Sequence, residues 1–135
     1  MELSEGEACA RLANARVARL ATVGADGQPH LVPVTFAADG NRIYTAVDHK
    51  PKTTSNLRRL RNIQENPLVA LLADHYAEDW DELWWVRVDG AAHILDSHER
   101  ALDMLVRKYQ QYQQRRPDGP FIMIEIERWS GWAWG

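Results

Sequence analysis

Residues 31–47 read LVPVTFAADGNRIYTAV, two apolar runs on either side of Asp39-Gly40. Asp-Gly signals a two-residue turn, because glycine tolerates the positive φ that a tight hairpin needs. A further apolar run over residues 16–23 and a glycine-containing break at residues 24–27 come just before. Three strands therefore follow one another with no room for the helical crossover of a parallel sheet. This stretch predicts an antiparallel sheet and excludes a doubly wound parallel one.

Three helices are predicted where a capping residue precedes apolar residues at helical spacing. A proline ends the second helix, because proline restricts the residue before it. The third helix carries leucines and tyrosines on one face. The signals run from Ser4 with Glu7 to Asn14, from Thr53 or Thr54 to Asn66-Pro67, and from Asp96 with Glu99, through Leu102, Leu105, Tyr109 and Tyr112, to residues 116–120.

Three more strands complete the sheet. Residues 69–73 form a short apolar run, and residues 83–95 form a longer one with Gly90 at an expected bulge or bend. Residues 121–127 alternate apolar and other side chains, as a half-exposed strand does. Six strands with helical covers are best closed into a small barrel, which leaves no exposed edges.

Composition and charge narrow the classes of function. The net charge of -3 and the pI near 5.9 argue against the broad basic face that duplex nucleic acid requires. No apolar run approaches the roughly 20 residues that span a bilayer, so we expect no membrane span and a cytoplasmic location. The one cysteine, Cys9, can form neither an internal disulfide nor a thiolate metal cage.

Nucleophile and metal signatures are missing from the sequence. The serines lack the context of a catalytic nucleophile, and no two histidines stand at metal-ligand spacing. We therefore expect no catalytic residue and no metal site. The acidic residues 74–82 are most simply a solvated loop, with binding of a hard cation as the alternative.

A basic segment at residues 50–64 is the positive signal, because it holds two lysines and three arginines and no acidic residue. Lys50 and Lys52 flank a proline that stiffens the loop, and Thr53 stands at the start of the second predicted helix. Backbone N–H groups and the dipole at a helix N-terminus favour an anion, so these residues suit a phosphate. A solvated basic helix face is the alternative that spacing alone leaves open.

Five segments together carry a family resemblance: GQPHLVPVTF at 27–36, RIYT at 42–45, KTTSNLR at 52–58, NPLVAL at 66–71 and VRVDG at 86–90. In these segments the chain resembles the split-barrel flavin-binding proteins of the pyridoxamine 5'-phosphate oxidase-like superfamily. Within it, the chain most resembles the actinobacterial branch of deazaflavin (coenzyme F420)-dependent reductases. The resemblance covers residues 4–128. It implies a mainly β (α+β) fold, a six-stranded antiparallel split β-barrel with short flanking helices, as a single domain over residues 1–135.

The resemblance also implies a homodimer with two cofactor sites at its interface. Each cofactor phosphate would lie on the basic loop, and the partner subunit would contribute two residues from its fifth strand. Relatives often have arginine where this chain has Lys50, and lysine lacks the two-pronged contact of arginine with phosphate. The implied cofactor-binding residues are Lys50, Lys52 and Thr53 at the phosphate, Thr45 on the strand below, Val34 and Thr35 along the tricyclic ring, Asn56 supporting the loop, and Trp84 and Arg87 from the partner subunit.

The implied activity is that of an oxidoreductase that transfers a hydride from reduced coenzyme F420 to an electron-poor small organic substrate. The cofactor supplies the chemistry of such a step, and Arg87 is a candidate for stabilising charge or for contacting a phosphate or carboxylate. FMN is the alternative cofactor, and non-catalytic storage or sensing of a flavin is an alternative function. Haem occurs in related barrels, but no histidine here stands out as an axial ligand.

The C-terminal residues 129–135, WSGWAWG, are not a general feature of the family. Their tryptophans suit either a wall for a planar ligand or packing in a dimer, and the sequence leaves both open. An interaction protein that uses its tryptophans as a hot spot is the competing function from another class.

Overall fold

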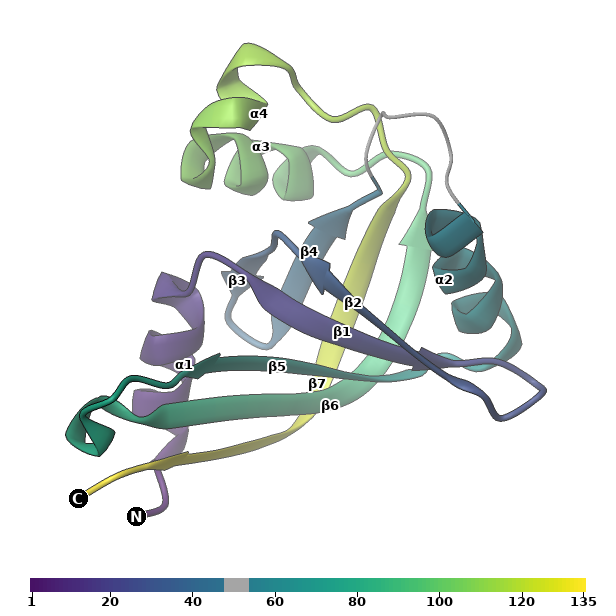
Figure 1. The fold of residues 1–135 in the computed structure, drawn as a ribbon. Coiled ribbons are helices and arrows are strands. Elements are labelled where there is room, and N and C mark those ends of the chain that lie inside the picture. Colours follow the sequence, from purple (N-terminus) through teal and green to yellow (C-terminus); the bar gives the residue numbers. More distant parts are fainter. Residues whose placement is uncertain (48–53) are drawn as a thin grey trace.

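The structure of the protein, a computed structural model, describes residues 1–47 and 54–135, with the backbone alone for residues 54–57. Short strands alternate with a few helices (Figure 1). The elements in chain order are α1 Glu5–Asn14, β1 Ala18–Val23, β2 Pro29–Val34, β3 Ala37–Asp39, β4 Arg42–Ala46, α2 Thr54–Glu65, β5 Leu68–His75, the 3-10 turn η1 Trp80–Glu82, β6 Trp84–Leu95, α3 Glu99–Lys108, α4 Gln110–Gln114 and β7 Phe121–Ala133.

The described strands form one antiparallel sheet in the order β2-β1-β5-β6-β7-β4-β3. Strands β2 and β3 are therefore at opposite edges, although only Thr35 and Phe36 join them in the chain. A sheet with this connection cannot be flat, and Figure 1 shows it curled, with the β1–β2 hairpin crossing in front of β4 and β7. The fold is the predicted antiparallel split barrel with few helices.

The predicted number of strands is wrong, because the strand expected over residues 31–36 ends at Val34 and residues 37–39 form a further short strand, β3. The described sheet has seven strands where six were expected. Phe36 and Thr35 take side-chain partners in place of strand partners. The N–H of Phe36 donates to the hydroxyl of Tyr109, at 3.0 Å, and the hydroxyl of Thr45 donates to the carbonyl of Thr35, at 2.7 Å. The chain can thus leave one edge of the sheet and enter the other.

The third predicted helix starts later than expected and is divided. His98 is its N-cap in place of Asp96, because the Nδ1 of His98 accepts a hydrogen bond from the N–H of Ala101, at 3.1 Å. The helix breaks at Tyr109, which has extended φ and ψ of -117° and 121°, and α4 follows.

Three local signals are confirmed. Ser4 and Glu7 form both hydrogen bonds of the capping box. Helix α2 ends at Glu65, before Asn66-Pro67. The pairing of β6 with β7 shifts register between Asp89 and Gly90, where a bulge was expected. The last strand, by contrast, does not end at residue 127. It continues to Ala133, because β6 begins at Trp84 and offers partners along its whole length.

The hydrophobic core fills the inside of the curled sheet. It includes Leu20, Leu71 and Val88 from the strands and Leu12 from α1. A second cluster lies where α3 packs on β3 and β4, while α2 packs on β1 and β6. Among the helices of the described ranges, none is long and apolar enough to cross a membrane.

Replacing Gly90 tests the bulge. A Cβ at residue 90 would stand far inside van der Waals contact with the carbonyl oxygen of Glu125. We therefore expect Gly90→Ala to lower the free energy of unfolding by about 1–3 kcal/mol, as overpacking does. Urea denaturation followed by circular dichroism measures this change. Gly6→Ala is the control, because a Cβ there meets nothing within 4 Å. Equal stability of the two variants would contradict the packing seen at Gly90.

Candidate functional site

Three of the predicted cofactor-binding residues come together where β2 ends. Val34 is the buried last residue of β2, Thr35 follows it, and Thr45 is buried near the end of β4. The Oγ1 of Thr35 is 2.8 Å from the hydroxyl of Tyr112, and the Oγ1 of Thr45 donates to the carbonyl of Thr35. We call Thr35, Thr45 and Tyr112 the threonine corner. Thr45 is two residues before Val47, the last described residue ahead of residue 48.

Two tyrosines of the site were missed as functional residues. Tyr112 binds Thr35, and the buried hydroxyl of Tyr109 accepts from the N–H of Phe36 and lies 2.9 Å from the carbonyl of Arg16. Burial raises the pKa of Tyr109. The sequence placed both tyrosines on the apolar face of a helix. Their hydroxyls were the available signal, because a buried phenol needs a hydrogen-bond partner.

The predicted phosphate residues Lys50, Lys52 and Thr53 lie outside the described residues. Asn56 lies in the first turn of α2, where only the backbone is described.

The described part of the basic segment is not uniformly solvated. Arg59 is only 6% exposed, and burial lowers its pKa while Tyr112 raises it. Arg58 lies 3.6 Å from the carboxylate of Asp26 in the β1–β2 turn, whereas Arg61 is exposed. A wholly solvated basic face is therefore wrong for the part of α2 whose side chains are described.

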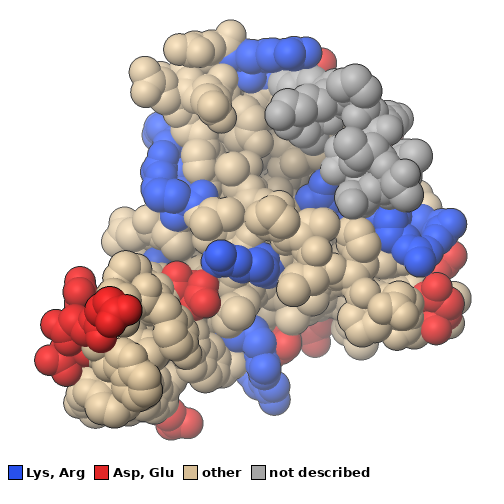
Figure 2. Space-filling model, viewed as in Figure 1, with Lys and Arg blue, Asp and Glu red and all other residues tan. Residues whose placement is uncertain are grey.

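Negative charge gathers elsewhere. Figure 2 shows acidic side chains at the end of the molecule that carries η1, away from the blue side chains near α2. Among the described residues, no group of three or more His, Cys, Asp or Glu side chains could hold a metal ion.

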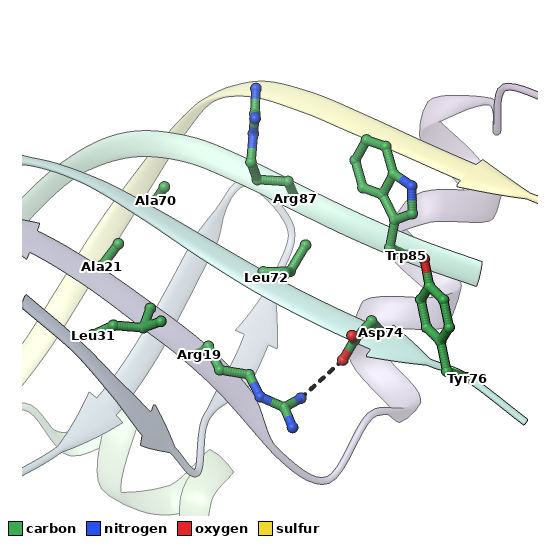
Figure 3. Close-up of a pocket in the computed structure, with 9 residues that line it drawn as sticks. All are labelled: Arg19, Ala21, Leu31, Ala70, Leu72, Asp74, Tyr76, Trp85 and Arg87. Carbon is green, nitrogen blue, oxygen red and sulfur yellow. Dashed lines mark hydrogen bonds and ion pairs between the residues drawn. The ribbon is translucent and has the colours of Figure 1, made fainter. Parts of the chain in front are cut away.

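The structure does not bring the last two predicted residues together. Trp84 and Arg87 are three positions apart on β6, so they point to opposite faces of the sheet. Trp84 packs against the core, and the guanidinium of Arg11 on α1 lies 5.6 Å from its ring. Arg87 is on the outward face, and its Nε is 3.3 Å from Asp89. Trp85 shares that face with Arg87 (Figure 3).

A cavity of about 660 Å³ opens on the outward face of the sheet. Its floor carries small and aliphatic side chains, and aromatic and charged side chains rise around it (Figure 3). Arg19 and Asp74 form an ion pair of 2.9 Å at its side. The alternation of buried and more exposed residues along β1, β5 and β6 was the sequence signal that one face of these strands points outward. The residues of this sheet-face pocket are Arg19, Ala21, Leu31, Ala70, Leu72, Asp74, Tyr76, Trp85 and Arg87.

The two tryptophan groups of the sequence meet at one end of this face. Trp134 contacts Trp80 edge to face, with ring centroids 5.5 Å apart, and lies 6.0 Å from Trp132. Trp132 is directly opposite Trp85 in the pairing of β7 with β6. Trp129 instead packs against the core. The C-terminal tryptophans therefore belong to two different faces.

The curled antiparallel sheet and the threonine corner at its closed edge define a split-barrel protein. A family model described as pyridoxamine 5'-phosphate oxidase matches residues 4–133, and the chain belongs to this family.

Three relatives show the range of the family. A protein of Streptomyces rimosus named 5a,11a-dehydrotetracycline/5a,11a-dehydrooxytetracycline reductase is 31% identical over 118 residues, 87% of this chain and 72% of that protein. An F420H(2)-dependent biliverdin reductase of Mycobacterium tuberculosis is 26% identical over 121 residues, 90% of this chain and 81% of that protein. The crystal structure of an FAD-binding protein from Mesorhizobium loti has a TM-score of 0.73 and 25% identity, and the match covers 97% of this chain and 95% of that one.

A buried cation lies beneath the connection between β2 and β3. The Nζ of Lys108 is shielded from solvent and has no hydrogen-bond partner among the described residues. It lies 4.0 Å from the ring centroid of Phe36 and 5.3 Å from that of Tyr109. Burial, with a smaller contribution from Arg16, lowers the pKa of Lys108 to about 8. The ring faces compensate only part of the lost hydration.

This pKa predicts a pH dependence of stability. Unfolded Lys108 keeps its proton up to about pH 10.4, so between about 8 and that value the unfolded chain binds more protons than the folded one. The free energy of unfolding should therefore rise with pH in this window. Lys108→Met should abolish the rise and increase the melting temperature at pH 7, where the buried charge opposes folding. Thermal melts at several pH values measure both. The exposed neighbour substitution Arg107→Met is the control, and a rise that persists in Lys108→Met would contradict the assignment.

Proposed function

We propose that the protein is an oxidoreductase that uses a flavin-type cofactor, with reduced coenzyme F420 as the first choice and FMN as the alternative. Its substrate would be a small conjugated organic molecule with an electron-poor carbon. The observation that carries the proposal is that Val34, Thr35 and Thr45, assigned to the cofactor by resemblance, meet at one corner of the fold. The names of two relatives as reductases, one of them dependent on F420H(2), support this choice.

The chemistry of the corner fits a flavin-type ring. The side chain of Val34 packs in the hydrophobic core and supports the corner from below. The half-buried hydroxyl of Thr35 has one side-chain partner among the described residues, Tyr112, so it retains capacity for a hydrogen bond to a ring edge. The hydroxyl of Thr45 is committed to the Thr35 carbonyl and holds that backbone in place. In this proposal Lys50, Lys52 and Thr53 bind the phosphate, and Asn56 supports their loop.

When bound, the reduced cofactor supplies the hydride. The residues of the chain bind and orient the reactants and exclude water, which is how a site without a nucleophile accelerates a transfer between two bound molecules. We therefore assign no catalytic residue. Binding without turnover is the second candidate, favoured by a relative that is named only for binding FAD.

Titration of the purified protein with F420 and with FMN, followed by turnover assays on a panel of enones, tests the function. We expect tighter binding of F420 and its oxidation by at least one enone. Preferential binding of FMN would reject F420 as the cofactor, and tight binding with no turnover would support storage.

Lys52→Ala should weaken cofactor affinity about 10- to 100-fold, the value of one charged hydrogen bond, without changing the melting temperature of the apo-protein. Arg42→Ala, exposed at the far end of β4, is the control. Unaltered affinity of Lys52→Ala would remove that lysine from the site.

We also propose that a second copy of the chain covers the outward face of β2, β1, β5 and β6, so that the cofactor sites lie at the interface of a homodimer. Large apolar side chains stand exposed on this face, with Leu31 at 66% and Leu68 at 59%. Exposed apolar surface of this kind commonly marks an interaction site. In such a dimer Arg87 would lie at the interface, within reach of the partner's site. The side chain of Trp84 is on the other face of the sheet, so Trp84 would reach the partner's site only through the backbone of β6.

Leu31→Asp should weaken this dimer by placing a carboxylate on the covered face, where its dehydration costs several kcal/mol. Light scattering during size-exclusion chromatography at several concentrations measures the change, and we expect a monomer at micromolar concentration. Val17→Asp is the control, because Val17 is also exposed but precedes β1. A monomeric parent protein, or a Leu31→Asp variant that dimerises like the parent, would reject this interface.

A further inference from the structure

Two side chains with unused hydrogen-bonding capacity lie side by side where β6 pairs with β7, next to the sheet-face pocket that Arg87 lines. Arg87 on β6 is directly opposite Ser130 on β7. The Nε of Arg87 and the Oγ of Ser130 are both shielded from solvent, and neither makes a hydrogen bond in the part of the chain that the structure describes, although the Nε lies 3.3 Å from its ion-pair partner Asp89. Since shielded polar groups in folded proteins are nearly always paired, this pair points to a ligand that supplies the acceptor.

The bulge at Gly90 creates this pair. From Trp84 to Asp89 the two strands keep one register, in which Asp89 is opposite Arg128. Beyond the bulge the register shifts by one residue, so that Gly90 is opposite Ile126. If the register of Gly90 with Ile126 continued back along β6, Arg87 would be opposite Trp129, the residue that in this structure packs against the core. The bulge therefore places a hydroxyl, in place of an indole, beside the guanidinium.

The charge around the pair favours an anion. Arg87 and Arg128 share one carboxylate, that of Asp89, at 3.3 and 3.4 Å. Arg19 at the side of the pocket has its own partner in Asp74. These five groups carry three positive and two negative charges, so one positive charge is left beside the pocket. Arginine binds carboxylates best, through parallel hydrogen bonds.

The shape of the pocket favours a flat body on this anion. Its volume of about 660 Å³ lies within the range of small-molecule sites, about 300–1,000 Å³. Ala21, Ala70 and Leu72 form the floor, and Figure 3 shows Trp85 and Arg87 rising on the same side of β6, with Tyr76 beside Trp85. Aromatic walls over a smooth apolar floor suit a planar ring system.

We propose that the sheet-face pocket binds a planar conjugated carboxylate, whose rings pack against Trp85 and Tyr76 and whose carboxylate accepts hydrogen bonds from Arg87 and Ser130. That this ligand is the substrate of the reductase rests on the proposed function, whereas its binding to the pocket does not. A second copy on the outward face would close the open side of the pocket.

Calorimetric titration of the cofactor-free protein with pyrenecarboxylate and with its uncharged carboxamide tests the proposal. We expect the carboxylate to bind about 10- to 100-fold more tightly, the value of charged hydrogen bonds. Arg87→Met should abolish this preference while leaving carboxamide affinity nearly unchanged, and Ser130→Ala should reduce it. Arg100→Met, on α3 and paired with Asp39, is the control and should keep the full preference.

Each other outcome overturns the inference. Equal affinity for the two probes, no binding of the carboxylate, or a preference that survives in Arg87→Met would each do so. Arg87 is 41% exposed, so its variant should fold, and a thermal melt checks this. Because no cofactor is present, failure here leaves the F420 and FMN titrations standing, and failure of those titrations leaves the carboxylate site standing.

Discussion

Two residues, Thr35 and Phe36, join strands at opposite edges of the sheet, and the rest of the structure depends on this connection. The seven strands, at about 4.8 Å spacing, would span about 29 Å if flat, whereas the three peptide units from Val34 to Ala37 reach about 11 Å. The sheet must therefore curl until its edges meet. The hydroxyl of Tyr109 holds the connection in place through the backbone of Phe36.

The same connection positions the proposed cofactor site. Thr35 is held through its carbonyl by Thr45 and through its hydroxyl by Tyr112, so its orientation is set before any ligand binds. Groups fixed in this way lose little entropy on binding. The Nζ of Lys108 beneath Phe36 is shielded without a hydrogen-bond partner among the described residues, and burial lowers the pKa of this lysine. Local violations of good packing of this kind are expected near functional sites.

The outward face follows from the period of two along each strand. Odd and even positions of β6 face opposite sides, which separates Trp84 from Arg87 and puts Trp85 beside Arg87. Small residues such as Ala21 and Ala70 leave room above the sheet, and the aromatic side chains stand around that room. The bulge at Gly90 then sets which residue of β7 each residue of β6 meets.

The sequence alone determined the antiparallel class, the capping box of Ser4 and Glu7, the end of α2 before Pro67 and the bulge at Gly90. Each of these is decided by residues close together in the chain, through backbone φ, capping or alternation. Only the tertiary structure decided that the chain passes from one edge of the sheet to the other at Thr35 and Phe36, that His98 caps α3 and that Tyr112 binds Thr35. The Thr35–Tyr112 pair joins residues 77 apart, and no local pattern encodes which of many possible partners a hydroxyl meets once the sheet has curled.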